Sequence, residues 1–157
     1  MCIEALETKI VHHARHDETA RRIATIPGVG PITASLIVAT VADISAFESA
    51  RHFAAWLGLV PRQYSTGGKT RLGRITKTGN SEIRKSLVLG ATVMIRYAGQ
   101  WNSTAGAWFR GVLERRPVRL ATVALANKMA RIAWALMTRK EVYQAKGRLV
   151  AAATAVA

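Results

Sequence analysis

Residues 59–84, LVPRQYSTGGKTRLGRITKTGNSEIR, separate two regions that have the spacing of amphipathic helices. The hydrophobic residues of this segment follow neither the helical nor the strand period, and its cations are interleaved with glycines. Long loops without structure of their own are uncommon in a compact domain unless they are functional or disordered. Glycines allow a close approach of the backbone to a ligand, and cations favour an anionic one. This segment is therefore predicted to be a long basic loop that binds an anion. The predicted contact residues are Arg62, Gly67, Gly68, Lys69, Arg71, Arg74, Lys77 and Arg84.

The composition limits the class of protein and of partner. The chain has 157 residues, enough for one domain with a core, and a net charge of +14. This charge favours nucleic acid or an anionic membrane surface. A membrane has little support, because no run of about eighteen apolar residues occurs and the first ten residues carry acids where a signal peptide carries cations. The single cysteine, Cys2, excludes an internal disulfide framework and a cysteine-based zinc site, so we expect a cytoplasmic protein.

The apolar spacing on both sides of the basic loop predicts an all-α fold, a compact helical domain without a strand-rich region or an internal repeat. In the last helix, Leu120, Val123, Ala124, Ala130 and Trp134 fit a core face that Lys128 and Arg131 flank. The alanine-rich residues 146–157 are expected to fray. The predicted helices are residues 3–25, a helix that ends near Val41, residues 48–57, a helix capped by Asn80 or Ser81, residues 101–113 and residues 118–137.

The run IPGVGPITA, which begins at Ile26, has the pattern of a helix-hairpin-helix element. Gly28 and Gly30 permit a tight turn, and Pro31 suits the first position of the following helix. The N-terminus of that helix offers free N–H groups to a phosphate, so the element would contact the DNA backbone without reading its sequence. Alternatively, the glycines are needed only for the packing of two helices. A similar packing role is expected for Gly90, because a glycine inside a helix costs about 1 kcal/mol relative to alanine.

The residues capable of chemistry are few. The nine acids are scattered, without the pairing of a two-metal nuclease or a glycosidase, and no metal site is predicted. His12 and His16 lie one helical turn apart, but surface positions account for them better than a metal site. Ser65 and Thr66 lie at the centre of the basic loop. A serine there can attack a phosphodiester if arginines hold the phosphate; alternatively, both hydroxyls only bind phosphate oxygens.

Arg84 lies in the first turn of a predicted helix, together with Lys85. Cations at this end of a helix oppose its dipole. An anionic partner would relieve this unfavourable placement, so the first turn is expected to face the same ligand as the basic loop.

Several segments together resemble the C-terminal domain of the insertion-sequence 110, 116 and 902 transposases, including the 1111 subgroup. They are IPGVGPITA, the Asp43 and Phe47 pair, RHFAAWLGLVPRQYSTGGKTRLGRITKTGN, IRKSLVLGA and VALANKMARIAWALM. The resemblance extends from Arg22 to Tyr143. It divides the chain into the end of an interdomain helix (residues 1–25), the transposase C-terminal helical domain (residues 26–145) and the tail (residues 146–157).

The resemblance implies more than the residues alone. Such transposases join an N-terminal RuvC-like domain, with a DEDD metal site, to a C-terminal domain that supplies a serine nucleophile. It implies a serine–DNA intermediate, an element-encoded guide RNA and a homo-oligomer in the full-length proteins. By position in the YSTGG motif the nucleophile would be Ser65, with Thr66 as the alternative hydroxyl. No cofactor is implied for this chain, since Mg²⁺ would bind the DEDD domain.

The DEDD domain has no counterpart in this sequence, and the acids present cannot replace it. We therefore expect either a fragment of a broken element or the distal half of a split transposase, which binds DNA without completing transposition alone. A separate DEDD half is then a possible partner. Two alternatives remain open: a non-enzymatic helix-hairpin-helix DNA-binding module, and an RNA-binding accessory protein.

Overall fold

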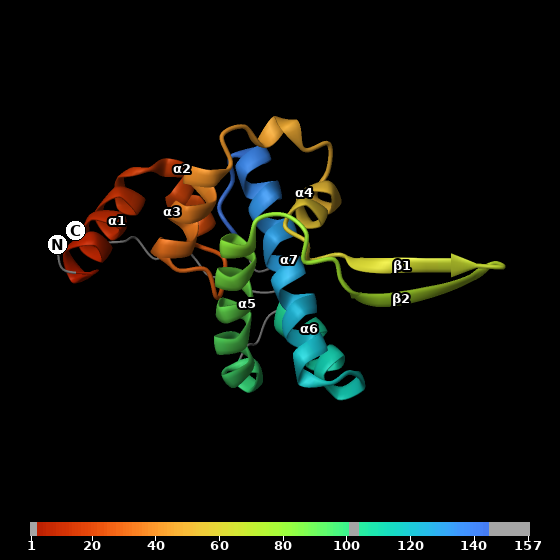
Figure 1. The fold of residues 1–157 in the computed structure, drawn as a ribbon. Helices are drawn as coiled ribbons and strands as arrows, with labels where there is room; N and C mark the ends of the chain where they lie inside the picture. The colour runs from red at the N-terminus through yellow and green to blue at the C-terminus, as the bar shows by residue number, and fades with distance from the viewer. Residues whose placement is uncertain (1–2, 101–103, 145–157) are drawn as a thin grey trace.

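Helix α7 (Val118–Arg139) is the centre of the fold in the computed structural model, which describes residues 3–100 and 104–144. It packs against α2 (Glu18–Ile23), α4 (Ala50–Trp56), α5 (Ser81–Arg96) and α6 (Thr104–Arg115), as Figure 1 shows. The remaining elements are α1 (Ile3–His16), α3 (Pro31–Thr40), the 3-10 turns η1 (Ile44–Ala46) and η2 (Ala98–Gln100), and the strands β1 (Pro61–Thr66) and β2 (Lys69–Ile75). The expected fraying of residues 146–157 lies outside the described residues.

The core face of α7 differs from the predicted one. Of the predicted core residues only Ala130 is buried, whereas Leu120 is 51% exposed and Val123, Ala124 and Trp134 are half-buried. The helix is rich in alanine on several faces, so the apolar spacing did not define one stripe. The buried residues are Ala121, Thr122, Leu125, Ala126, Met129, Ala130, Ala133 and Leu136.

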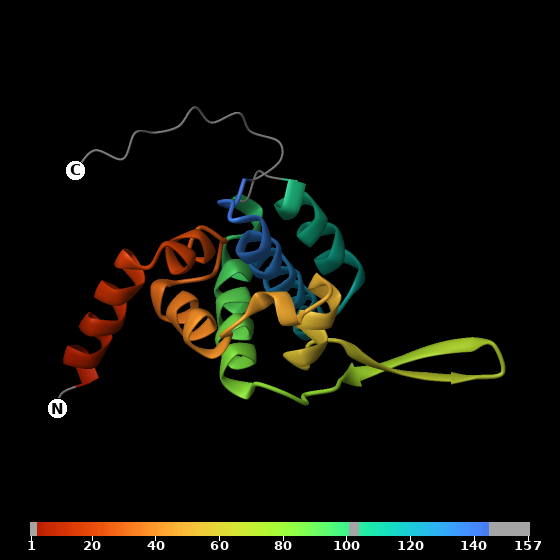
Figure 2. The ribbon, with the colours of Figure 1, turned by 90° about the horizontal axis from the view of Figure 1, so that it is seen from above.

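The first predicted helix, residues 3–25, is interrupted. Asp17 has an extended backbone, and its side chain accepts a hydrogen bond from the Ala20 N–H at 2.7 Å, so it caps α2. An aspartate prefers this role to a helix interior, because its carboxylate pairs an N–H that has no intrahelical partner. Helix α1 extends to one side of the molecule, where it contacts α2 and α3 (Figure 2).

A close approach of two glycines joins the turn between α2 and α3 to helix α5. A Cβ on Gly90 would lie 2.0 Å from the carbonyl oxygen of Gly28, which no real contact allows. Gly28 has a φ of +85°, and a Cβ there would lie 2.8 Å from Cγ of Met94. The predicted packing role of Gly90 is confirmed. Asn80 begins α5 as predicted, since its side chain accepts a hydrogen bond from the Ile83 N–H at 2.9 Å.

The prediction of a long irregular loop is wrong for residues 61–75, because they form an antiparallel β-hairpin. Gly67 and Gly68 make the two-residue turn with φ values of +59° and +76°, the signs that a type I′ turn requires. The hairpin extends from the helical body into solvent (Figures 1 and 2), and a bulge lies between Pro61 and Gln63. The fold is therefore mainly helical, with a two-stranded sheet among the described residues.

Candidate nucleic-acid interface

The β-hairpin of residues 61–75, here called the basic hairpin, carries exposed cations on both strands. Arg62 lies in β1, and Lys69, Arg71 and Arg74 lie in β2. No acid occurs between Glu48 and Glu82 in the sequence. In the described part of the chain, the ion pairs of Arg22 with Glu18 and of Lys85 with Glu82 involve no cation of the hairpin, so these pairs leave its charge uncompensated. The basic hairpin therefore presents a region of uncompensated positive charge.

Strand pairing places Ser65 next to the turn of the basic hairpin. In register Ser65 pairs with Thr70, and the flanking pairs are Thr66 with Lys69 and Tyr64 with Arg71. For Ser65 and Thr66 the structure describes the backbone. The structure thus brings both predicted hydroxyl residues into the same short segment as Gly67, Gly68, Lys69 and Arg71.

Tyr64 adds an aromatic side chain to the basic hairpin. A Cβ on Gly73 would lie 2.8 Å from Cε2 of Tyr64, so the ring lies over this glycine on the neighbouring strand. The side chain is nevertheless 58% exposed. An exposed ring among cations is a feature of surfaces on which nucleic-acid bases stack.

Arg84 and Lys77 lie at the base of the basic hairpin and differ in their surroundings. The Nη1 group of Arg84 donates a hydrogen bond to the carbonyl oxygen of Leu57 at 2.9 Å, at the C-terminal end of α4. The negative end of α4 thus offsets the unfavourable position of the Arg84 cation in the first turn of α5. From the sequence, an anionic ligand was expected in this role. Lys77 has a φ of +57°, its N–H bonds the carbonyl of Gly58, and its side chain is exposed.

Helices α2 and α3, which the segment with Gly28 and Gly30 connects, lie on the other side of the α5 and α7 pair from the basic hairpin (Figure 1). Gly28 is half-buried against α5. This position fits the alternative interpretation of the motif, in which the glycine is needed for helix packing. Gly30 is exposed at the N-cap of α3, with Pro31 following in the first turn.

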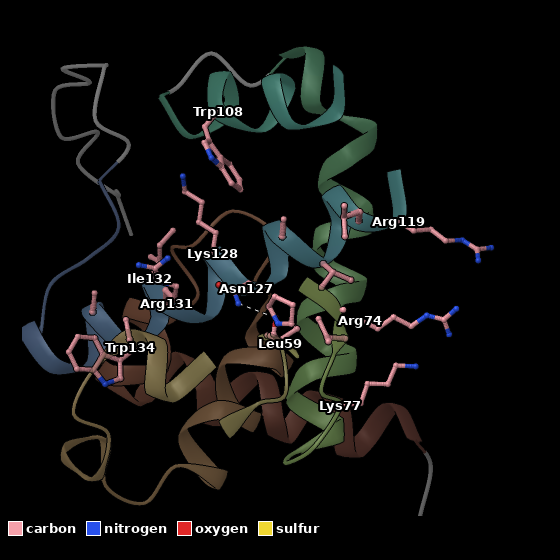
Figure 3. Close-up of a pocket in the computed structure, with 18 of the residues that line it drawn as sticks. Leu59, Arg74, Lys77, Trp108, Arg119, Asn127, Lys128, Arg131, Ile132 and Trp134 are labelled. Carbon is pink, nitrogen blue, oxygen red and sulfur yellow. Dashed lines mark hydrogen bonds between the residues drawn. The ribbon is translucent and has the colours of Figure 1, made fainter. Parts of the chain in front are cut away.

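A groove of about 1370 Å³ lies where the base of the basic hairpin meets α4, α6 and α7 (Figure 3). We call it the basic groove, because its lining includes six cations and, among these residues, no acid. Its cations are Arg74, Lys77, Arg119, Lys128, Arg131 and Arg139. Apart from Asn127, the other lining residues are non-polar: Ala50, Leu59, Pro61, Gly73, Ile75, Trp108, Pro117, Leu120, Val123, Ala124, Ile132, Trp134 and Ala135.

Side-chain contacts fix the walls of the basic groove. The Nζ atom of Lys128 lies 3.9 Å from the centre of the Trp108 ring, a cation–π contact that joins α7 to α6. Burial, followed by the nearby Arg131 charge, lowers the pKa of Lys128. Trp134 Nε1 donates to the carbonyl oxygen of Phe47 at 3.2 Å, and Asn127 Nδ2 donates to that of Leu59 at 3.1 Å.

Sequence reasoning missed most of the basic groove. It considered Lys128 and Arg131 as flanks of a core face and did not consider Trp108 or Arg119 as site residues. One signal was available: no acid occurs among residues 118–139, so the cations of α7 have no partner within the helix. This absence of acids leaves the exposed face of the helix with uncompensated positive charge.

Two further properties restrict the site. Among the described residues, no group of three or more histidine, cysteine, aspartate or glutamate side chains is placed to hold a metal ion. In the same part of the chain, every helix is too short or too polar to cross a bilayer.

Comparison with known proteins identifies the family. Residues 20–105, more than half of the chain, match the transposase IS116/IS110/IS902 family. The chain belongs to this transposase family. The matched residues include the turn between α2 and α3, the basic hairpin and all of α5. The resemblance found in the sequence is confirmed.

Relatives of the IS116/IS110/IS902 family extend this similarity over most of the chain. A family 20 transposase of Pseudomonas aeruginosa is 45% identical over 142 residues, which cover 90% of this chain and 42% of the relative. A transposase of Sinorhizobium fredii is 49% identical over 93% of the chain and 38% of the relative. The transposase of insertion sequence element IS1111A from Coxiella burnetii is 43% identical over 83% and 36%. The chain thus spans about two fifths of the length of these relatives.

Proposed function

We propose that this chain is the DNA-binding part of an insertion-sequence transposase and supplies its serine nucleophile. The observation that carries the proposal is the acid-free basic hairpin with Ser65 beside its Gly-Gly turn, in a chain of this transposase family. Exposed cations on a projecting hairpin suit a phosphate backbone. The positive φ values of Gly67 and Gly68, and the absence of a Cβ, allow that backbone to come close to the turn.

In the proposed reaction, Oγ of Ser65 attacks the phosphorus of a DNA phosphodiester. An Oγ–phosphorus bond forms while the bond to one deoxyribose oxygen breaks, and the serine proton passes to a base or to water. The departing oxygen takes up a proton and leaves as a strand-end hydroxyl. The exposed cations of the basic hairpin stabilise the negative charge that develops on the phosphate oxygens. Thr66 is the alternative nucleophile, because it is the neighbouring hydroxyl in β1.

The reaction requires components beyond the described residues. Mg²⁺ would be held by a DEDD domain, supplied by another part of the protein or by a separate chain, and an element-encoded guide RNA would select the DNA. Alone, this chain binds nucleic acid and does not complete strand transfer. The exposed N-terminus of α3 at Gly30 and Pro31 supplies a secondary backbone contact of the helix-hairpin-helix type.

Covalent trapping tests the nucleophile. The chain is combined with a DEDD domain, the guide RNA of the element, Mg²⁺ and a nicked DNA substrate that cannot religate, and adducts are separated in denaturing gels. We expect an adduct with the unaltered chain and with Thr66→Ala, and none with Ser65→Ala. If Ser65→Ala still forms the adduct, the nucleophile is another residue. If DNA binding depends on Arg71 and Arg74 but no adduct ever forms, the non-enzymatic DNA-binding module is the better account.

The RNA-binding alternative needs its own comparison. Structured RNA and duplex DNA of equal length are titrated at the same salt concentration, since affinities at different salt cannot be compared. We expect the duplex to bind with at least similar affinity. A strong preference for the folded RNA would favour the accessory-protein alternative.

A further inference from the structure

We infer that the basic groove binds an unpaired, single-stranded segment of nucleic acid, with its bases against the apolar floor and Trp108 and its phosphates against the cations at the rim. The inference deepens the proposed function and rests on it: the basic hairpin binds the sugar-phosphate backbone, and the basic groove receives bases that have left a duplex.

The charge of the groove identifies an anionic occupant. All of its ionisable lining residues are cationic, and both long elements that form it are free of acids, since none occurs among residues 59–77 or 118–139. Arg131 and Arg139 on α7 are exposed and carry no ion pair among the described residues. Six cations around one hollow repel one another, and phosphate groups would relieve this repulsion.

The floor distinguishes a single strand from a duplex. Leu120, Val123, Ala124, Ile132 and Ala135 form an aliphatic surface along the groove side of α7. A duplex turns its charged backbone outward and stacks its bases inside, so it would leave this surface without an apolar partner. An unpaired base exposes flat faces that stack on aromatic and aliphatic side chains.

Trp108 is the residue best placed to stack a base. Its side chain is 37% exposed on α6 and points into the groove in Figure 3. In the free protein its ring is covered by the ammonium group of Lys128, 3.9 Å from the ring centre. A bound phosphate attracts that ammonium group away from the ring, and a base then takes its place. Lys128 therefore serves as a cover in the free state and as a phosphate contact in the bound state.

Continuity with the basic hairpin favours nucleic acid over an acidic protein helix, which the same charge and floor would also accommodate. Gly73, Arg74 and Ile75 belong to strand β2 and also line the groove. A strand bound along the hairpin can thus enter the groove without leaving the protein surface. A protein helix docked in the groove would have no use for this connection.

The test compares two probes on the full chain at one salt concentration: a fluorescent oligothymidylate of about 12 nucleotides, within the usual range of single-strand site sizes, and a blunt duplex of equal length. Trp108→Ala should reduce the affinity for the oligothymidylate by about ten-fold or more, the scale of one lost base stack. The affinity for the duplex should change by less than about two-fold. Trp108→Phe should restore much of the single-strand affinity. Tyr97→Ala is the matched control, because Tyr97 is an exposed aromatic residue that does not line the groove.

The outcomes separate the inference from the proposed function. If Arg71→Gln weakens duplex binding while Trp108→Ala and Lys128→Gln leave the oligothymidylate unaffected, the inference fails and the proposed function stands. If neither probe binds the unaltered chain, the proposed function fails as well. Should an acidic amphipathic peptide bind in a Trp108-dependent manner while the oligothymidylate does not, the groove is a protein-docking site. Equal weakening of both probes by Trp108→Ala also overturns the inference, because it would show no preference for unpaired bases.

Discussion

The side-chain amide of Asn127 donates a hydrogen bond to the carbonyl oxygen of Leu59, 3.1 Å away and 68 residues earlier in the chain (Figure 3). Asn127 lies in the middle of α7, and Leu59 is the buried residue just before the basic hairpin. The bond joins the central helix to the base of the basic hairpin, and thereby joins two walls of the basic groove.

Loss of this bond should destabilise the protein. Asn127→Ala leaves the Leu59 carbonyl without its side-chain partner, in a part-buried position, which typically costs about 1–3 kcal/mol. The loss of stability is measured as the decrease in the free energy of unfolding from urea titration. Gln63→Ala is the control, because Gln63 is exposed in β1 and should change stability by less than about 0.5 kcal/mol. Equal effects of both changes would contradict a structural role for the bond.

Gly90 should not tolerate even alanine. The added Cβ would lie 2.0 Å from the carbonyl oxygen of Gly28, so α5 and the turn must separate at a cost of about 1–3 kcal/mol or more. Except at the low end of its range, this cost exceeds the gain of about 1 kcal/mol in helix propensity. Gly111→Ala in α6 is the matched control, since its Cβ would meet only a side-chain atom of Arg115 at 3.8 Å. Thermal unfolding should show a lower Tm for Gly90→Ala and an equal or higher one for Gly111→Ala.

The turn of the basic hairpin should affect binding without affecting global stability. Gly67 has a φ of +59°, which a β-branched residue adopts only with strain, whereas asparagine tolerates it. Because the hairpin projects from the helical body, Gly67→Val should disturb it locally and reduce DNA affinity at nearly unchanged Tm. Gly67→Asn should retain the affinity. Global unfolding of Gly67→Val, seen by circular dichroism, would show that the helical core depends on the hairpin.

The salt dependence of DNA affinity should show how many phosphate contacts the basic hairpin makes. Each phosphate contact contributes about 0.9 to the slope of log K against log salt for duplex DNA. Arg71→Gln and Arg74→Gln should each reduce that slope by about one, whereas Arg21→Gln, an exposed cation on α2, should leave it unchanged. A similar loss from all three changes would indicate non-specific attraction by net charge.

The pKa of Lys128 should respond to Arg131. Burial and then the Arg131 charge lower this pKa, because both disfavour a second positive charge. Arg131→Gln removes the second cause, so the pKa of Lys128 should rise, as NMR titration of its Cε group would show. Bound phosphate should raise it further, since an adjacent anion favours the ammonium form. A fall in the pKa after Arg131→Gln would contradict this electrostatic account.

The basic hairpin illustrates where sequence patterns are weak. Two residues of the type Gly-Gly between β-prone runs indicate a hairpin, yet the strands have solvent on both faces and a bulge between Pro61 and Gln63. Such strands have no need for alternating apolar residues, so the period that identifies a half-buried strand is missing. The basic and glycine-rich character of the segment was visible, but its regular structure was not.

Most helices, the Asn80 cap and the family could be predicted from the sequence, because each depends on neighbouring residues or on a continuous motif. The sequence also predicted a packing role for Gly90, but not its partner Gly28, which lies in a distant turn. The buried face of α7 depends on how the helices pack, since an alanine-rich helix fits a core with more than one face. The basic groove also forms only in the folded chain, because its walls come from segments as distant as Leu59, Trp108 and Arg131. A surface formed by such convergence depends on how the helices pack, and no local spacing of residues encodes it.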